Sequence, residues 1–165
     1  MQSGLKNQQQ MQEKHMMNFA RKIVDSFGSL IQNAELSEDV KKAFKITALI
    51  HRFNMLCPVS VVKNSLKNFN WDEFTLKVVK EDGKGILFQE FNNTINDEPD
   101  LYFKTKHPVI ADALIKTIIN NNEKNSLYKN VFSNLTLSDY NARFIVDLVK
   151  NIRNNDTDIS EGQIE

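Results

Sequence analysis

Apolar residues recur every three or four positions along most of the chain, a spacing typical of helices with one buried face. Ser37 precedes one such stripe, and its hydroxyl can cap a helix whose first turn is acidic. Pro58 begins another, because a proline ring fixes φ at a value that suits the first helical turn. In the first half of the chain, the stripes predict helices at 11–36, 41–53, 58–67 and 71–81.

The spacing of apolar residues shortens to two beyond residue 84, which indicates β-strands. Residues 85–91 and 100–104 are predicted to pair as a hairpin, and the polar segment 92–99 between them is predicted to form a long tip. Pro108 then restarts the helical spacing. The stripe that it begins fades in an Asn run, which we interpret as compositional bias or loop, and two more helices are expected around 123–132 and 140–153.

Three short helices followed by a two-stranded wing is the element order of a winged helix-turn-helix. We therefore predict a mainly α fold: a helical domain containing a winged helix-turn-helix, with the hairpin 85–104 as its wing, followed by further helices. The alternative is a helical bundle with an incidental hairpin. The predicted organisation is a flexible lead-in (1–10), an N-terminal helix (11–36), the winged-helix domain (37–106), C-terminal helices (107–153) and an acidic flexible tail (154–165).

The composition of the chain argues against several classes of function. Basic and acidic residues both number 21, so the chain lacks the broad positive field of a protein that coats nucleic acid or anionic lipid. No run of about 18 apolar residues is present, so we expect neither a membrane span nor a membrane partner. The N-terminal residues do not resemble a secretory signal, and a single cysteine cannot form an internal disulfide. We therefore expect a cytoplasmic protein.

Catalytic and metal-binding motifs are missing from the sequence. Cys57 lies in apolar surroundings and is interpreted as a buried small side chain. The three histidines have no ligand spacing, so no metal site is expected. Gly83 and Gly85 flank Lys84 between a helix and a strand, which is the reverse of a phosphate loop and indicates a turn. We expect no catalytic residues and no enzymatic activity in this chain.

DNA binding is an alternative function, because winged helices often insert their third helix into the major groove. The predicted helix 71–81 and the residue after it carry two lysines against four acids, a poor match to phosphates, and neither that helix nor the wing holds an arginine to read guanine. The residues that would serve this function are Lys63, Lys67, Lys77, Lys80 and Lys84.

The junction between the wing and the next helix is the most informative stretch. His107 precedes Pro108 at a predicted helix start, where free backbone N–H groups and the positive end of the helix dipole favour an anion. Lys104 and Lys106 add positive charge nearby. The competing interpretation is a histidine that only caps the helix.

The same stretch resembles a known family. Residues 102–111, YFKTKHPVIA, are similar to the end of the winged helix in STAND-class P-loop ATPases, the NACHT and NB-ARC relatives. Residues 44–53 with 57–60 resemble the segment that follows the ATPase lid, and residues 19–23 resemble the end of the lid itself. The resemblance covers roughly residues 15–120 and implies that the helix 11–36 is lid-like.

In that family, a histidine at this junction contacts the phosphate of bound ADP and holds the inactive state. The resemblance assigns this role to His107, with Lys106 standing where arginine is common. No Walker A or Walker B segment is present, so ADP or ATP is expected as a cofactor only when the chain is joined to an ATPase core. The resemblance thus implies a non-catalytic regulatory and protein-interaction module whose partner is the ATPase core or an effector protein. A second alternative to it is a helical adaptor or oligomerisation protein.

Overall fold

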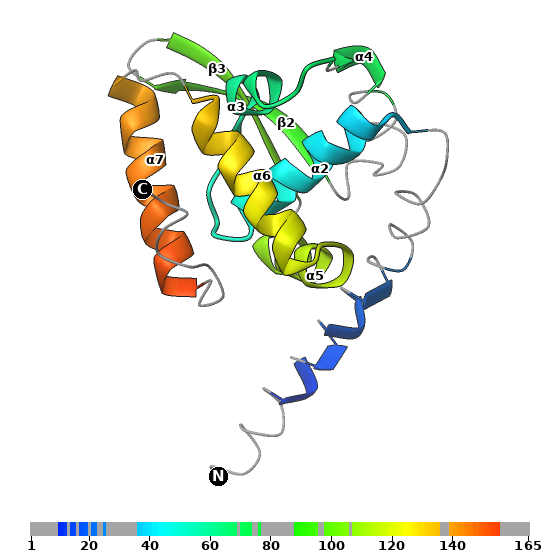
Figure 1. Cartoon of the computed structure of the whole chain (residues 1–165). Helices are drawn as coiled ribbons and strands as arrows, with labels where there is room; N and C mark the ends of the chain where they lie inside the picture. The colour runs from blue at the N-terminus through cyan, green and yellow to red at the C-terminus, as the bar shows by residue number, and fades with distance from the viewer. Residues whose placement is uncertain are drawn as a thin grey trace.

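The computed structural model describes residues 10–12, 14, 15, 17–19, 21, 22, 25, 36–68, 70–73, 76, 88–95, 98–105, 107–135 and 139–155 (Figure 1). The described residues between 10 and 25 are helical, as predicted, and Phe19 is 59% exposed there. The rest of the predicted helix 11–36, most of the lead-in and the acidic residues 156–165 lie outside the described residues.

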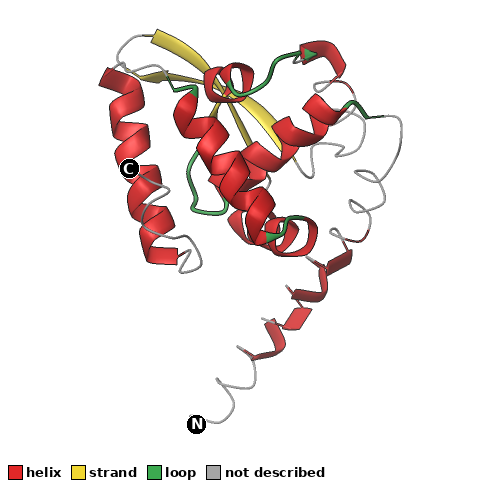
Figure 2. Ribbon diagram, in the orientation of Figure 1, coloured by secondary structure: helices red, strands yellow, loops and turns green. Residues whose placement is uncertain are grey.

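The fold is mainly α, with a winged helix-turn-helix followed by further helices, which confirms the predicted fold class (Figure 2). The elements in chain order are α2 (Glu38–His51), β1 (Cys57–Pro58), α3 (Val59–Asn64), α4 (Trp71–Glu73), β2 (Phe88–Ile95), β3 (Glu98–Thr105), α5 (Pro108–Ile118), α6 (Asn121–Ser133) and α7 (Asp139–Asn155). The third predicted helix, 71–81, is described over α4 and at residue 76 only.

The described strands form an antiparallel sheet in the order β1-β3-β2, so β3 pairs on both sides. The hairpin is confirmed, but the predicted long tip at 92–99 is wrong. Pairing continues from Phe88 opposite Thr105 to Ile95 opposite Glu98, so most of this polar segment is strand. Strand β1 was not predicted: Cys57 and Pro58 pair with Phe103 and Tyr102 before the chain turns into α3.

Side-chain caps fix where several helices begin. The Ser37 hydroxyl accepts from the Val40 N–H at 3.3 Å, as its position predicts. The predicted helix 58–67 is shorter, because Pro58 is extended in β1 and α3 runs only from Val59 to Asn64. The Asn run is not a loop throughout: the Asn120 carboxamide accepts from the Glu123 N–H at 2.9 Å and starts α6.

The end of α2 is closed by an unusual backbone conformation. Asn54 has φ of 58°, a left-handed conformation that asparagine tolerates better than most residues. Its N–H donates to the His51 carbonyl at 2.8 Å, so the chain reverses directly after the helix. This turn leads the chain towards β1.

One cluster of buried apolar side chains joins the winged helix to the helices after it. Helix α2 crosses the middle of the molecule and contacts α5, β3 and α6 (Figure 1). The largest fully buried members of this cluster are Phe103, Ile46, Leu49, Ile50, Leu114, Leu148, Ile152, Val40 and Val62. Residues on both sides of the predicted boundary at 106–107 contribute to this cluster within the described chain.

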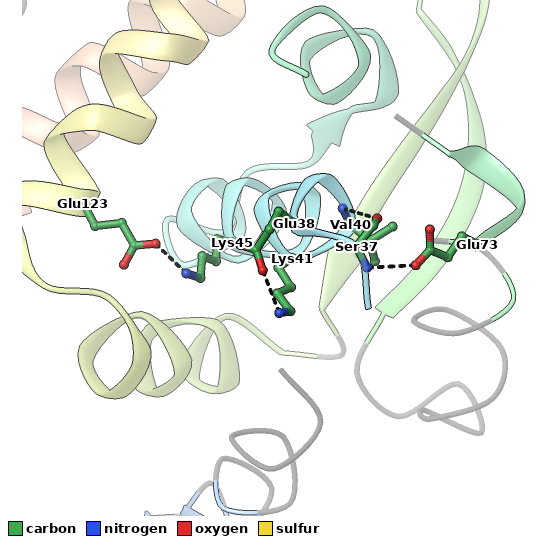
Figure 3. Close-up of polar contacts among 7 residues, drawn as sticks. All are labelled: Ser37, Glu38, Val40, Lys41, Lys45, Glu73 and Glu123. Carbon is green, nitrogen blue, oxygen red and sulfur yellow. Dashed lines mark hydrogen bonds and ion pairs between the residues drawn. The ribbon is translucent and has the colours of Figure 1, made fainter. Parts of the chain in front are cut away.

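Polar contacts join α2 to its neighbours (Figure 3). Lys45 of α2 forms an ion pair with Glu123 of α6, and Lys41 forms one with Glu38 at 2.7 Å. The Ser37 N–H donates to the Glu73 carboxylate of α4 at 3.0 Å. The bond between Ser37 and Glu73 places the start of α2 beside α4.

Candidate functional site

His107 lies where β3 ends and α5 begins. Its backbone is extended, and its ring Nδ1 accepts a hydrogen bond from the Val109 N–H at 3.2 Å. Its carbonyl accepts from the N–H groups of Ile110 and Ala111 at 3.0 and 3.2 Å. The first N–H groups of α5 are therefore bonded to His107 and are not free for an anion, contrary to the prediction from the sequence. His107 caps the helix, and its phosphate-sensing role stays a prediction. The ring is exposed at the surface.

Beneath His107, two buried side chains join three elements. The Thr105 hydroxyl, at the end of β3, donates to the His107 carbonyl at 2.9 Å. The same oxygen lies 2.5 Å from Nδ1 of His51, in the last turn of α2. Both side chains are buried, so the contact between them is shielded from water. The ends of α2 and β3 and the start of α5 thus meet in one hydrogen-bonded group.

Burial also changes the acid–base behaviour of His51. Desolvation, followed by the charges of Lys104 and His107, lowers the pKa of His51 to about 4. The imidazole is therefore neutral at pH 7. Lys104 is half-buried and close enough for its charge to act on His51, whereas the predicted site residue Lys106 lies outside the described residues.

A pocket of about 390 Å³ opens beside the first turns of α5. It is lined by Arg52 and Phe53 from the end of α2, Pro108, Val109, Asp112 and Lys116 from α5, and Asn155 from α7. The Arg52 guanidinium lies 4.6 Å from the centre of the Phe53 ring, in cation–π contact. Lys116 forms an ion pair with Asp112 at 2.6 Å. The pocket combines apolar walls with two cations and one carboxylate.

Sequence reasoning identified His107 but missed its surroundings. The cluster brings together His51, Thr105 and His107, of which only His107 was a predicted site residue. Arg52 could have been suspected, because a guanidinium group can bind phosphate oxygens through two hydrogen bonds. Nothing in the sequence pointed to Asn155, which reaches the pocket only through the packing of α7.

The residues predicted for DNA binding are only partly described. Lys63 and Lys67 are exposed at and beyond the end of α3. Lys77, Lys80 and Lys84 lie outside the described residues. In α4, the Glu73 carboxylate accepts a hydrogen bond from the Ser37 N–H, so this acid is directed towards α2 (Figure 3).

The other candidates from the sequence can be compared with the described residues. Cys57 is fully buried in β1, and burial raises the pKa of its thiol to about 12, so it is protonated and unreactive at pH 7. Among the described residues, no group of three or more His, Cys, Asp or Glu side chains is placed to hold a metal ion. None of the described helices has the length and apolar character needed to cross a membrane.

Comparisons of this chain with protein-family models, with curated proteins and with solved structures find no match. Its function is therefore inferred from the site.

Proposed function

We propose that this chain is a non-catalytic regulatory and protein-interaction module of a STAND-like ATPase, in which the start of α5 senses nucleotide phosphate. The observation that carries the proposal is the pocket beside the His107-capped end of α5, with Arg52 and Lys116 in its wall. Phosphate oxygens are acceptors, and charge-assisted hydrogen bonds from guanidinium, ammonium and imidazole groups are the contacts they bind best.

The arrangement is suited to binding and not to bond cleavage. Hydrolysis of a nucleotide requires a metal-bound phosphate and an oriented water, which the phosphate loop and acidic motif of an ATPase core supply. Neither motif is present in the sequence. His107, with Lys104 and Lys106 close to it in the sequence, would instead report which nucleotide occupies a site completed by the ATPase core. The partner is that core or an effector protein. ADP or ATP serves as a cofactor only in the joined protein, and the isolated chain binds it weakly at most.

The position of the site would couple nucleotide binding to partner binding. A phosphate contact at the start of α5 acts on an element that shares a core with α2. A local charge contact of this kind can bias a two-state domain arrangement. Bound ADP would favour one domain arrangement. Loss of ADP would favour the other arrangement, which binds the partner.

This proposal predicts weak, His107-dependent binding of ADP to the isolated chain. ADP titrated into isotopically labelled protein should shift the amide signals of Val109 and Ile110, with a dissociation constant in the millimolar range. His107→Ala should weaken this binding about tenfold, because one charge-assisted hydrogen bond is worth about 1.5 kcal/mol or more.

His15→Ala is the matched control, because His15 is an exposed histidine on the N-terminal helix, and it should leave ADP binding unchanged. Equal ADP binding by wild type and His107→Ala would contradict the proposal. Turnover of ATP by the purified 165-residue chain would also contradict it.

DNA binding is the second candidate, favoured by the winged-helix fold and by the exposed Lys63 and Lys67. If it is correct, random duplex DNA should be retarded in a mobility-shift experiment at low salt and released steeply as salt rises. Lys63→Ala with Lys67→Ala should reduce the salt slope by about 2, one per lost phosphate contact. If the chain is a regulatory module instead, duplex DNA should not be retarded at low or at moderate salt.

A further inference from the structure

The hydrogen bonds around His107 form a continuous chain through three elements. It runs from the His51 ring in α2 to the Thr105 hydroxyl in β3, and from there to the His107 carbonyl. Beyond that carbonyl, the His107 ring returns to the first turn of α5 through the Val109 N–H. The donor and the acceptor of every hydrogen bond in this series can be assigned.

The assignment starts from Thr105. A hydroxyl group has one hydrogen, and Thr105 uses it on the His107 carbonyl, which can only accept. The short contact to His51 must therefore use the hydroxyl oxygen as acceptor, so Nδ1 of His51 carries the ring proton. At the other end, Nδ1 of His107 accepts from a backbone N–H, so the neutral His107 ring carries its proton on Nε2.

The Thr105 hydroxyl helps to fix the backbone of the capping residue, His107. The His107 carbonyl accepts from Thr105 as well as from the first N–H groups of α5, so the backbone of the capping residue is held from both sides. With the backbone fixed, the ring keeps its bond to the Val109 N–H. The exposed ring is then left with one donor, Nε2–H.

We propose that His51 and Thr105 are positioning residues, which hold His107 as the Nε2–H tautomer so that it can donate a hydrogen bond to an anion at the start of α5. This inference rests on the proposed function, because the anion is the nucleotide phosphate. Neither residue touches the anion. Both act through the backbone of His107, from beneath the surface.

The test is the ring-nitrogen NMR spectrum of His107, combined with titration of inorganic pyrophosphate. In the wild type at pH 8, Nε2 should show a protonated, pyrrole-type signal and Nδ1 an unprotonated one. Thr105→Val keeps the shape of the side chain and removes the hydroxyl, so the two His107 signals should move towards each other as the tautomers mix. Pyrophosphate affinity should fall about fivefold, the ratio that corresponds to one hydrogen bond of about 1 kcal/mol.

Two variants separate positioning from general damage to the fold. Thr105→Ser restores the hydroxyl and should recover both the ring signals and the affinity. Thr117→Val removes a hydroxyl that donates to the Ala113 carbonyl at 2.7 Å further along α5, and it should change neither. If Thr105→Val does not fold, His51→Asn and His51→Leu take its place, because the asparagine amide can donate to Thr105 and leucine cannot.

The outcomes distinguish this inference from the proposed function. Unchanged His107 ring signals in a folded Thr105→Val or His51→Leu variant would overturn the positioning role, whatever pyrophosphate does. Ring signals that change as expected, in a protein that binds no pyrophosphate even as wild type, would retain His51 and Thr105 as residues that position His107. That second result would refute the phosphate-sensing function and the anion as the purpose of the positioning.

Discussion

Phe103→Ala is expected to lower the free energy of unfolding by about 3–5 kcal/mol, the usual range for removing a buried aromatic side chain. Phe103 is completely buried in β3 and lies opposite Cys57 on one side and Glu90 on the other. Truncation leaves a cavity beneath the strand that presents Thr105 to His107. Urea denaturation at pH 7 measures the loss, which is a large part of the 5–15 kcal/mol typical of a domain.

Val146→Ala is the control for this substitution, because Val146 of α7 is 50% exposed and should change stability by about 0.5 kcal/mol or less. A loss below about 1 kcal/mol for Phe103→Ala would mean that β3 does not pass through the core as the structure has it.

Acidification is expected to destabilise the protein through His51. The folded state holds the pKa of His51 at about 4, whereas the unfolded chain has the ordinary value near 6.5. Between these values, the unfolded state binds a proton that the folded state does not, so stability falls as the pH drops from about 6.5 to about 4. The gap corresponds to a loss of about 3 kcal/mol.

The contribution of His51 can be separated from that of other groups. We would measure urea unfolding between pH 7 and pH 4.5 for the wild type, for His51→Leu and for His15→Asn. His51→Leu should flatten the pH dependence over this interval, and His15→Asn should leave it as in the wild type, because His15 is exposed. Parallel curves for the wild type and His51→Leu would show that His51 is not buried as a neutral ring.

Local chemistry explains which parts of the fold were predictable from sequence. Ser37 and Pro108 mark helix starts through bonds and dihedral angles that involve only residues within one helical turn. Asn120 was missed although the same rule applies, because an Asn run hides which member is the cap. The spacing that separates it from Glu123 is the signal that was overlooked.

The parts that were not predictable depend on partners far away in the sequence. Cys57 and Pro58 form a strand only because Phe103 and Tyr102 lie alongside, about 45 residues later. The polar segment at 92–95 extends β2 because its partner strand continues, against the turn preference of its residues.

The candidate site shows the same division. His107 could be identified from the sequence because the next residue, Pro108, indicates the start of a helix. His51 could not, because its partner Thr105 is 54 residues away. No local pattern marks a histidine as buried and neutral. The pocket likewise requires the end of α7 to lie near the start of α5, which is a matter of helix packing.

The shared packing of α2 and α5 determines how the molecule can move. Rotating α5 about the 106–107 junction would pull Leu114 away from the core that it shares with α2, and would break the bond between Thr105 and the His107 carbonyl. The winged helix and α5 are therefore expected to move as one rigid body. A displacement of α5 at His107 is therefore expected to move β3 and α2 with it.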